Sequence, residues 1–288
     1  MSAPRYRPTD APSSSAQGDG APPRDERFEP DEKGVMPFLD HLEELRWSLL
    51  KGGIGVLCTT ILAAIFSRWI IDTILIGPTR PDFFMYEVLR LDAQELQLLN
   101  RTITGQFFAD IGTILVVGMV AGSPIIVYYL WKFIEPALYP EERSGMKFAS
   151  WAATFFFLLG IAFGYLILTP VALHFFASYE VSPQVVNQFD IITYFSMISF
   201  WALGAGLLFE LPVVVYFLSK VGILTPALMR TYRKYALLAV LVIGALLTPP
   251  DPFSQIIMAI PLLLLYELSI GVSVYVRRRQ RKKQQALA

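Results

Sequence analysis

Long apolar blocks dominate this chain and restrict it to folds that a lipid bilayer can accommodate. About 20 consecutive apolar residues are enough to cross the hydrocarbon core as a helix, and several such blocks follow one another here. Of the 288 residues, 54% are hydrophobic and only 17% are charged, against about 25% charged in an ordinary soluble domain. These values exclude a soluble globular fold, and we predict an all-α integral membrane protein.

The apolar blocks predict six transmembrane helices. Their approximate ranges are residues 49–66, 107–130, 148–169, 195–218, 236–247 and 253–276. The fifth block holds about twelve residues, which as a helix cover about 18 Å of a hydrocarbon core about 30 Å thick. We expect short fifth and sixth helices. Either the bilayer thins locally around the fifth helix, or neighbouring helices shield it from lipid.

The two ends of the chain differ from this membrane domain, for which we predict residues 36–276. Residues 1–35 contain six prolines, a serine run and many charges, a composition typical of a disordered tail. They lack the continuous apolar stretch of a secretory signal peptide, so we expect the N-terminus to stay on the side of synthesis. Residues 277–288 form a basic C-terminal tail.

An amphipathic segment, residues 36–50, precedes the first span. Its apolar side chains recur at helical spacing and form one stripe, made of Phe38, Leu42, Leu45 and Leu49. Acidic side chains occupy the other side of this segment. The pattern predicts an amphipathic helix at the membrane surface that leads into the first span.

The basic residues predict the orientation in the membrane. Six spans place both termini on one face, and 20 of the 24 basic residues belong to that face. Two of the loops on the opposite face, residues 170–194 and 248–252, contain no Lys or Arg. Cytoplasmic loops carry the excess of basic residues, so we predict that both termini lie in the cytoplasm.

Several classes of function are excluded or disfavoured by what the sequence lacks. The formal net charge is zero, which gives no argument for nucleic acid as a partner. One cysteine and two histidines leave no metal-ligand spacing, and no Walker loop or hydrolase motif is present. We therefore predict a protein that is not an enzyme and that has no metal or other cofactor.

Ionisable groups inside membrane spans are rare and are candidates for function. Glu210 lies near the middle of the fourth span, two residues before Pro212, whose missing N–H frees a backbone carbonyl. We interpret this pair as a functional polar site, the alternative being a protonated glutamate bonded to its neighbours. Glu267 in the sixth span leaves both readings open. Asp110, near the outer end of the second span, favours a structural role.

Polar residues also mark the turn between the fifth and sixth spans. Asp251 precedes Pro252 and fits a helix N-cap with proline at the first helical position. Gln255 follows one turn later, and its amide could bond a partner helix. The turn therefore combines a structural signal with a candidate contact.

Acidic residues on the predicted cytoplasmic face stand out from their basic surroundings. They are Glu43, Glu44, Glu135, Glu141 and Glu142. Carboxylates can accept bidentate hydrogen bonds from an arginine guanidinium. These acids therefore form either an arginine-binding surface or a solvated loop with local ion pairs, and charge alone does not decide between the two.

Four motifs, in this order, resemble those of the TatC family, the multispanning core of the twin-arginine protein translocase. They are FLDHLEELR at 38–46, WKFIEPALYPEER at 131–143, FELP at 209–212 and LTPPDPFSQ at 247–255. The resemblance covers roughly residues 36–276. It implies a core component of a bacterial cytoplasmic membrane translocase that is driven by the proton motive force.

The resemblance also implies partners and site residues. Such proteins bind the twin-arginine signal peptides of folded proteins and recruit TatA- and TatB-type single-span partners, and we expect a homo-oligomer within the receptor complex. By motif position the signal-peptide site comprises Glu44, Glu142, Phe133 and Arg46. Glu210 matches an intramembrane polar site, and the partner-helix contacts are Asp251, Gln255 and Pro78.

Two other classes of function remain as alternatives. A proton- or cation-coupled secondary transporter of a small solute would use Glu210 and Glu267 as its ion site. Many such transporters are built from internal repeats. The sequence shows no internal repeat. A structural assembly factor would show no arginine-dependent affinity for peptides.

Overall fold

The structure, a computed structural model, consists of helices and one pair of two-residue strands in the part of the chain that it describes. That part comprises residues 38–92, 96–134, 146–182, 184–185, 187–247 and 252–287. The predicted tail, residues 1–35, lies outside the described residues. The account below concerns the unit from Met36 onward.

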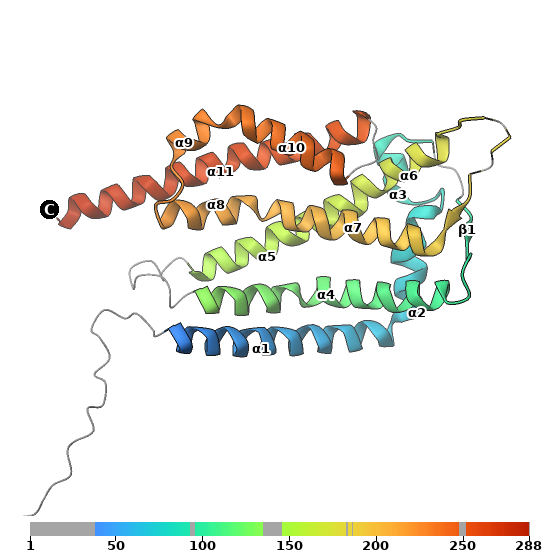
Figure 1. Ribbon diagram of the computed structural model, residues 1–288, viewed down its shortest axis with the longest axis horizontal. Coiled ribbons are helices and arrows are strands. Elements are labelled where there is room, and N and C mark those ends of the chain that lie inside the picture. Colours follow the sequence, from blue (N-terminus) through green and yellow to red (C-terminus); the bar gives the residue numbers. More distant parts are fainter. Residues whose placement is uncertain are drawn as a thin grey trace, which may run out of the picture. The chain divides into compact units, whose positions relative to one another are not determined.

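The first half of this unit contains one long helix pair with a folded segment between its members. In chain order the elements are α1 (Phe38–Ile65), α2 (Ser67–Ile70), the π-helical turn η1 (Ile71–Leu75), the 3-10 turn η2 (Gly77–Thr79), α3 (Phe84–Leu89), β1 (Leu98–Leu99) and α4 (Gly105–Ile134). Helix α4 returns beside α1 over most of its length (Figure 1).

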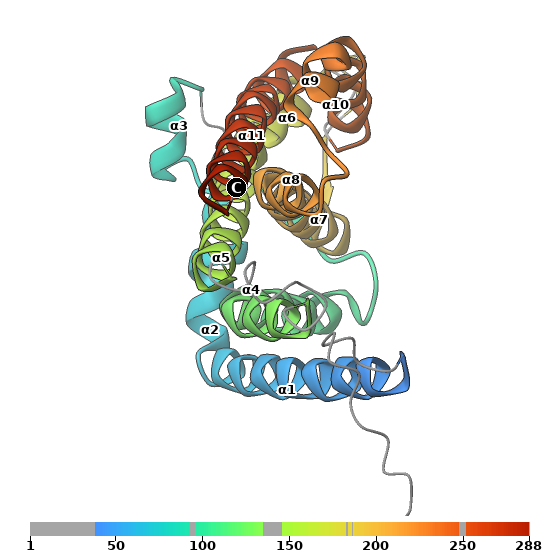
Figure 2. The same cartoon turned by 90° about the vertical axis from the view of Figure 1, so that its left-hand side faces the viewer.

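The second half contains the remaining membrane-crossing helices. Its elements are α5 (Met146–Phe163), the π-helical turn η5 (Gly164–Leu168), α6 (Thr169–Ser178), β2 (Phe189–Asp190), α7 (Ile191–Phe209), α8 (Leu211–Lys220), α9 (Pro226–Thr231), α10 (Arg233–Leu247) and α11 (Pro252–Leu287). Figure 2, turned by 90° from Figure 1, shows α4 beside α1 and α10 beside α11.

The described residues include five helices that are long and apolar enough to cross a membrane. They are Leu45–Ile65, Gly105–Leu130, Phe148–Ser178, Ile191–Lys220 and Ser254–Lys282. Helix α10, which corresponds to the fifth predicted span, has 15 residues and is not one of them. Its shortness was expected from the sequence. The first turn of α1 and the last turn of α11 lie at the same end of the bundle (Figure 1).

Two predictions about helix ends were wrong. Helix α1 is one unbroken helix of 28 residues, so residues 38–50 continue the axis of the span and do not form a separate surface helix. No proline interrupts this stretch, and nothing else forces a bend. The sixth helix is not short, because α11 has 36 residues. It continues through the basic segment 277–287, whose residues favour helix and contain no Gly or Pro.

Glycines allow close contact between neighbouring helices at two crossings. Gly118 and Gly122 of α4 face α1, where a Cβ atom on Gly118 would lie 2.5 Å from the Thr60 Cα. Thr59 Oγ1 donates a hydrogen bond of 2.7 Å to the Gly118 carbonyl across the same contact. Gly160 faces α7, where a Cβ would lie 2.5 Å from the Ala205 carbonyl oxygen. Small residues spaced by four are typical of such membrane-helix contacts.

The largest cluster of buried side chains lies among α5 to α7, α10 and α11. Its members include Phe163, Leu168, Trp201, Phe209, Val240, Met258 and Leu262. Two tyrosines attach η1 to this half of the unit: Tyr194 Oη donates to the Leu75 carbonyl at 2.6 Å, and Tyr165 Oη donates to the Ile74 carbonyl at 2.7 Å. Strands β1 and β2 pair in parallel beside them. These contacts fix the segment between α1 and α4.

Candidate functional site

The end of the helix pair where α1 begins and α4 ends gathers residues predicted to bind a peptide. Gly52 of α1 packs on Ile126 of α4. Because the two helices are antiparallel, extending this register by about six residues brings Arg46 level with Lys132. Phe133, the next residue of α4, is half-buried. The structure therefore brings Arg46 and Phe133 to one end of one helix pair.

Three predicted acidic residues can be placed only in part or not at all. The backbone of Glu44 belongs to α1, two residues before Arg46, and its side chain lies outside the described residues. Glu142 falls within residues 135–145, which connect α4 to α5 and also lie outside them. Asp251 lies outside them as well.

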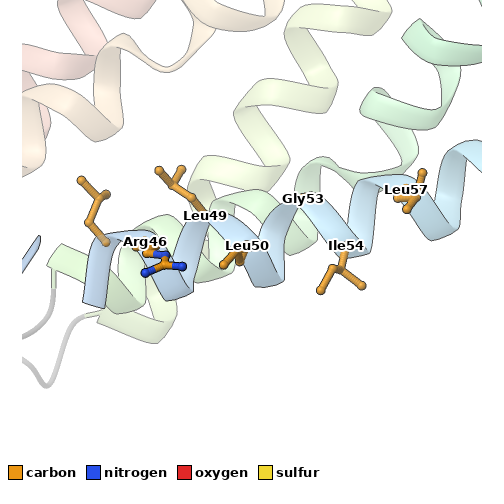
Figure 3. A pocket seen from close by; sticks show the side chains of 7 residues that line it. Arg46, Leu49, Leu50, Gly53, Ile54 and Leu57 are labelled. Carbon is orange, nitrogen blue, oxygen red and sulfur yellow. The ribbon is translucent and has the colours of Figure 1, made fainter. Parts of the chain in front are cut away.

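An open apolar groove of about 780 Å³ continues from Arg46 along α1. Figure 3 shows its lining, in which Arg46 is the only charged side chain among the labelled residues Leu49, Leu50, Gly53, Ile54 and Leu57. Only 11% of the apolar window of the span Leu45–Ile65 is buried inside the protein. Helix α1 therefore offers lipid or a partner a long apolar surface that begins at a cation.

A break in the fourth span surrounds Glu210. Helix α7 ends at Phe209 and α8 begins at Leu211, so Glu210 lies between them with Pro212 in the first turn of α8. Its backbone carbonyl accepts hydrogen bonds of 3.0 Å from the N–H groups of Val213 and Val214. The half-buried carboxylate has no hydrogen bond or ion pair within the described residues. This side chain is therefore available to a group outside the described residues.

Glu267, the other carboxylate singled out near the middle of a span, is paired. Its Oε2 atom lies 2.8 Å from an Nη2 atom of Arg233, which begins α10. The adjacent Tyr266 donates a hydrogen bond of 2.7 Å to the Met229 carbonyl of α9. Glu267 therefore joins α11 to the α9–α10 segment, a role in the fold that the sequence left open.

Gln255 also joins these helices. Its Nε2 atom donates a hydrogen bond of 3.1 Å to the Leu241 carbonyl of α10, and the residue remains partly exposed. Asp110 in α4 differs, because one of its carboxylate oxygens is buried without a hydrogen-bond partner among the described residues. The sequence favours a structural role for Asp110, and the described residues give its buried carboxylate oxygen no partner.

Pro78 lies inside the segment between α1 and α4. It is fully buried, and its carbonyl accepts a hydrogen bond of 2.7 Å from Tyr86 Oη. Burial raises the pKa of Tyr86 to about 12, so the phenol stays neutral and able to donate at physiological pH. The contacts that the structure gives Pro78 are within this chain, and a contact with a partner helix stays a prediction.

Asp190 fixes the start of α7, the helix that ends at Phe209, one residue before Glu210. Its carboxylate accepts a hydrogen bond of 3.1 Å from the Thr193 backbone N–H. This bond is the largest cause of the lowered pKa of Asp190. The residue is an N-cap that satisfies a free donor of the first turn, a role that was not predicted from the sequence.

Two further features of this region were not predicted from the sequence. Arg233, the partner of Glu267, precedes the short fifth block together with Arg230 and Lys234, and in the sequence these residues indicate only the orientation in the membrane. The glycine pairs Gly118/Gly122 and Gly160/Gly164 were readable as four-residue spacings in apolar helices. No group of three or more His, Cys, Asp or Glu that could hold a metal lies within the residues described.

Comparisons with known proteins agree on one family. The family model described as Sec-independent protein translocase protein (TatC) matches residues 40–261. A protein of that name from Blattabacterium sp. subsp. Periplaneta americana (strain BPLAN) is 36% identical over 263 residues, covering 86% of this chain and 99% of that protein. The TatC protein of Escherichia coli (strain K12) is 30% identical, covering 87% of this chain and 93% of its own length.

Solved structures give the same result for the fold. A crystal structure of a twin-arginine translocase receptor, TatC, superimposes with a TM-score of 0.65 at 34% sequence identity. The match covers 82% of this chain and 99% of that one. A second crystal structure of the receptor gives a TM-score of 0.66 at 33% identity.

Proposed function

This chain belongs to the TatC family and is the receptor subunit of a Sec-independent (Tat) protein translocase, and from this premise we propose which of its surfaces bind which partners. It is a transport receptor and not an enzyme. It acts by binding peptides and helices, so its specificity comes from the placement of a few polar side chains on apolar helices.

The proposed signal-peptide site lies where α1 begins and α4 ends. Glu44 and Glu142 accept hydrogen bonds from the arginine pair of a twin-arginine signal peptide, and Phe133 and Arg46 border the site. Each charge-assisted hydrogen bond to a guanidinium contributes about 1.5–3 kcal/mol. A lysine cannot reproduce the bidentate geometry, so two such carboxylates discriminate between arginine and lysine pairs.

One observation carries this assignment: the α1–α4 register. Gly52 against Ile126 and Thr59 against Gly118 set the two helices so that Arg46 and Phe133 end at the same level. The backbone of Glu44 is less than one turn from Arg46. The connection 135–145, which holds Glu142, leaves α4 at this same end.

The apolar groove along α1 supports the same assignment. A signal peptide has a charged segment followed by about 7–15 apolar residues. The groove begins at Arg46 and continues along Leu49, Gly53 and Leu57 toward the middle of the span. The charged part of the peptide therefore binds at the carboxylates, and its apolar part follows α1.

For the membrane arrangement we propose six spans, with α10 as the short fifth crossing. The first turn of α1 and the last turn of α11 lie at the same end of the bundle, which requires an even number of crossings. The basic segment of α11 supports a cytoplasmic location for that end. The protein is thus a multi-pass component of a bacterial cytoplasmic membrane, and the proton motive force drives the transport that it supports.

Partner helices are proposed to bind at the polar side chains inside the membrane. Glu210 lies at a helix break with its carboxylate free of partners among the described residues. Gln255 stays partly exposed beside α10, and Asp251 precedes it in the sequence. TatA- and TatB-type single-span proteins bring a polar or cationic group to this site, and several copies of the chain assemble in the receptor complex.

A binding assay with the full chain in lipid nanodiscs tests the signal-peptide site. The wild type binds an Arg-Arg signal peptide at least about ten-fold more tightly than its Lys-Lys counterpart. Glu44→Gln and Glu142→Gln each remove about ten-fold or more of that affinity, and Glu142→Lys abolishes binding. The neighbouring carboxylates supply matched controls, Glu43→Gln and Glu141→Gln, which change the affinity by less than about two-fold. Equal losses in the controls, or no preference for arginine, would refute the site.

A further inference from the structure

A pocket of about 270 Å³ lies where the segment before α4 meets the start of α7, and the proposed function does not use it. Figure 1 shows β1, which pairs with β2 beside this pocket, at the end of the bundle opposite the C-terminus. At about 30 Å³ for each water-sized group, the pocket holds about nine such groups. It is called the outer pocket below. Its polar lining includes Arg101, Gln188 and Asp190, and its apolar lining includes Phe176, Met197 and Trp201.

The pairing of β1 with β2 brings the polar residues of the outer pocket together. Leu99 lies opposite Asp190 in the pair, so Arg101, which follows Leu99 closely, reaches the start of α7. The Arg101 backbone N–H donates a hydrogen bond of 3.5 Å to Asp190 Oδ1, and its Nη2 atom donates one of 3.4 Å to Gln188 Oε1. The guanidinium of Arg101 and the carboxylate of Asp190 form no ion pair with each other. A cation and an anion are therefore adjacent and both available to a ligand.

The lining residues on α7 give the depth of the outer pocket. Thr193, Met197 and Trp201 follow Asp190 at spacings of three or four residues, so they share one face of the helix. Trp201 lies about 16 Å further along α7 than Asp190. This helix belongs to the span Ile191–Lys220, and one leaflet accounts for about 15 Å of the hydrocarbon core. The outer pocket therefore extends from the level of the headgroups into one leaflet.

Trp201, at the deep end of the outer pocket, has an unused hydrogen-bond donor. The residue is 3% exposed, and its indole N–H makes no hydrogen bond to a described residue. Indole N–H groups of buried tryptophans usually have a partner. The other deep lining residues, Phe176 and Met197, are apolar and partly buried. This end therefore suits an apolar chain that carries an acceptor, such as the ester carbonyl of a lipid.

We propose that the outer pocket binds the headgroup of a zwitterionic phospholipid of the phosphatidylethanolamine class. The phosphate binds the remaining N–H donors of Arg101, because a guanidinium has five and Gln188 occupies one of them among the described residues. The ammonium group of the lipid binds the Asp190 carboxylate. An anionic headgroup that lacks an ammonium group would leave this carboxylate unpaired beside the phosphate, so charge complementarity selects the zwitterion.

The occupant is a lipid because of how the outer pocket is built. Its volume accommodates a headgroup and not a whole lipid, so the acyl chains leave it along Met197 and Trp201 into the leaflet. A soluble zwitterion would leave this apolar lining empty. The bound headgroup joins the segment before α4 to the start of α7. With the orientation proposed above, the lipid belongs to the outer leaflet, and the site is separate from the signal-peptide site at the other end of the bundle.

Native mass spectrometry of the detergent-purified full chain tests the proposal, with phosphatidylethanolamine and phosphatidylglycerol of identical acyl chains as probes. The wild type binds phosphatidylethanolamine at least about five-fold more tightly than phosphatidylglycerol. Arg101→Gln removes the donors to the phosphate and weakens binding of phosphatidylethanolamine by about ten-fold. Asp190→Asn keeps an oxygen that caps α7 and removes the charge, so the affinities for the two lipids come within about two-fold of each other.

Two further variants separate lipid binding from folding and from general charge. Arg80→Gln changes an exposed arginine of the same segment between α1 and α4 that does not line the outer pocket, and affinity stays within about two-fold of wild type. Arg101→Lys keeps a cation that binds phosphate and stays within about three-fold. The proposal would be overturned by equal loss in Arg80→Gln and Arg101→Gln, by loss in Arg101→Lys as large as in Arg101→Gln, or by an unchanged lipid preference in Asp190→Asn.

Soluble phosphoethanolamine distinguishes a lipid from a free headgroup. We expect it to leave the bound lipid in place at the same concentration, because it lacks the chains that contact Met197 and Trp201. Displacement of the lipid by this compound would overturn the assignment to lipid. The assay contains no signal peptide, so its result is separate from the test of the proposed function.

Discussion

Two glutamates lie near the middle of membrane spans in this protein, and their surroundings differ. Glu267 on α11 pairs with Arg233 of α10 at 2.8 Å. Glu210 lies at the break between α7 and α8, and the described residues give its carboxylate no partner. In the sequence the two looked alike, since both are single carboxylates in apolar blocks. The structure separates a carboxylate that joins two helices of this chain from one that is open to another chain.

The comparison bears on which class of function fits. A cation-coupled transporter would need Glu210 and Glu267 as an ion site. Glu267 already has its counterion in Arg233, so only one of the two carboxylates is available. The proposed partner-helix site uses only Glu210, whose carboxylate has no partner among the described residues. The pairing of Glu267 therefore favours the receptor function, which the family comparisons give, over the transporter.

The helices that carry the two glutamates also differ in how they pack against their neighbours. Helix α7, which precedes Glu210, packs its backbone directly against Gly160 of α5 and Gly164 of η5. Helix α11, which carries Glu267, is joined to α10 by polar contacts. These are the hydrogen bond of Gln255 to the Leu241 carbonyl and the ion pair of Glu267 with Arg233. Changes in packing should affect the Glu210 region most, and changes in charge should affect the Glu267 region most.

The largest expected effect comes from Gly160→Leu. A Cβ atom at this position would already lie 2.5 Å from the Ala205 carbonyl and 2.7 Å from the Gly206 Cα, so α5 and α7 must separate. We expect a loss of about 3 kcal/mol or more in the free energy of unfolding, which is a large part of the total. Size-exclusion chromatography and a thermal unfolding curve measure it. Gly271→Leu is the control, because nothing lies within 4 Å of a Cβ there. Equal loss in both variants would contradict the role of the glycine contact.

An intermediate effect is expected from Glu267→Lys, which places a second cation beside Arg233. We expect a loss of about 1–2 kcal/mol, since both side chains are about half exposed. The loss lowers Tm by roughly 2–8 °C for a chain of this size. The charge-swapped variant Arg233→Glu/Glu267→Arg restores most of Tm. If Glu267→Lys left Tm unchanged, the ion pair would have no role in joining α10 to α11.

The smallest expected effect on stability comes from Asp190, the N-cap at the start of α7. The Thr193 N–H bond lowers the pKa of Asp190, so the folded state favours the carboxylate. Its contribution to stability is present above the unfolded pKa of about 3.9 and disappears as the pH falls through the lower folded value. Asp190→Ala should lower Tm slightly at pH 7, and the difference from wild type should vanish in strong acid. A difference independent of pH would show that the cap does not act through its charge.

Much of the fold was predictable because membrane spans follow from apolar length alone. Five of the six predicted blocks correspond to helices long enough to cross, and the shortness of α10 followed from its twelve or so apolar residues. The shape of α1 and the length of α11 were not predictable in this way. Hydropathy marks where a chain is apolar, whereas a helix continues through polar residues until something breaks it.

The site was predictable in its residue types but not in its pairings. Motifs pointed to Glu44, Phe133 and Glu210, yet nothing in the sequence set Arg233 against Glu267. The two residues are 34 positions apart on different helices, and their contact depends on where α9 ends and α10 begins. That register comes from tertiary contacts such as Tyr266 to Met229.

The most direct test of the difference between the two glutamates is to measure how much partner protein is recovered with a variant of each. Full-length protein carrying Glu210→Gln or Glu267→Gln is purified from membranes that contain TatA- and TatB-type proteins, and the recovered partner is quantified against wild type. We predict that Glu210→Gln lowers recovery by about ten-fold with Tm unchanged, and that Glu267→Gln lowers Tm with recovery unchanged per folded molecule. Equal recovery in both variants, or a loss confined to Glu267→Gln, would contradict the account.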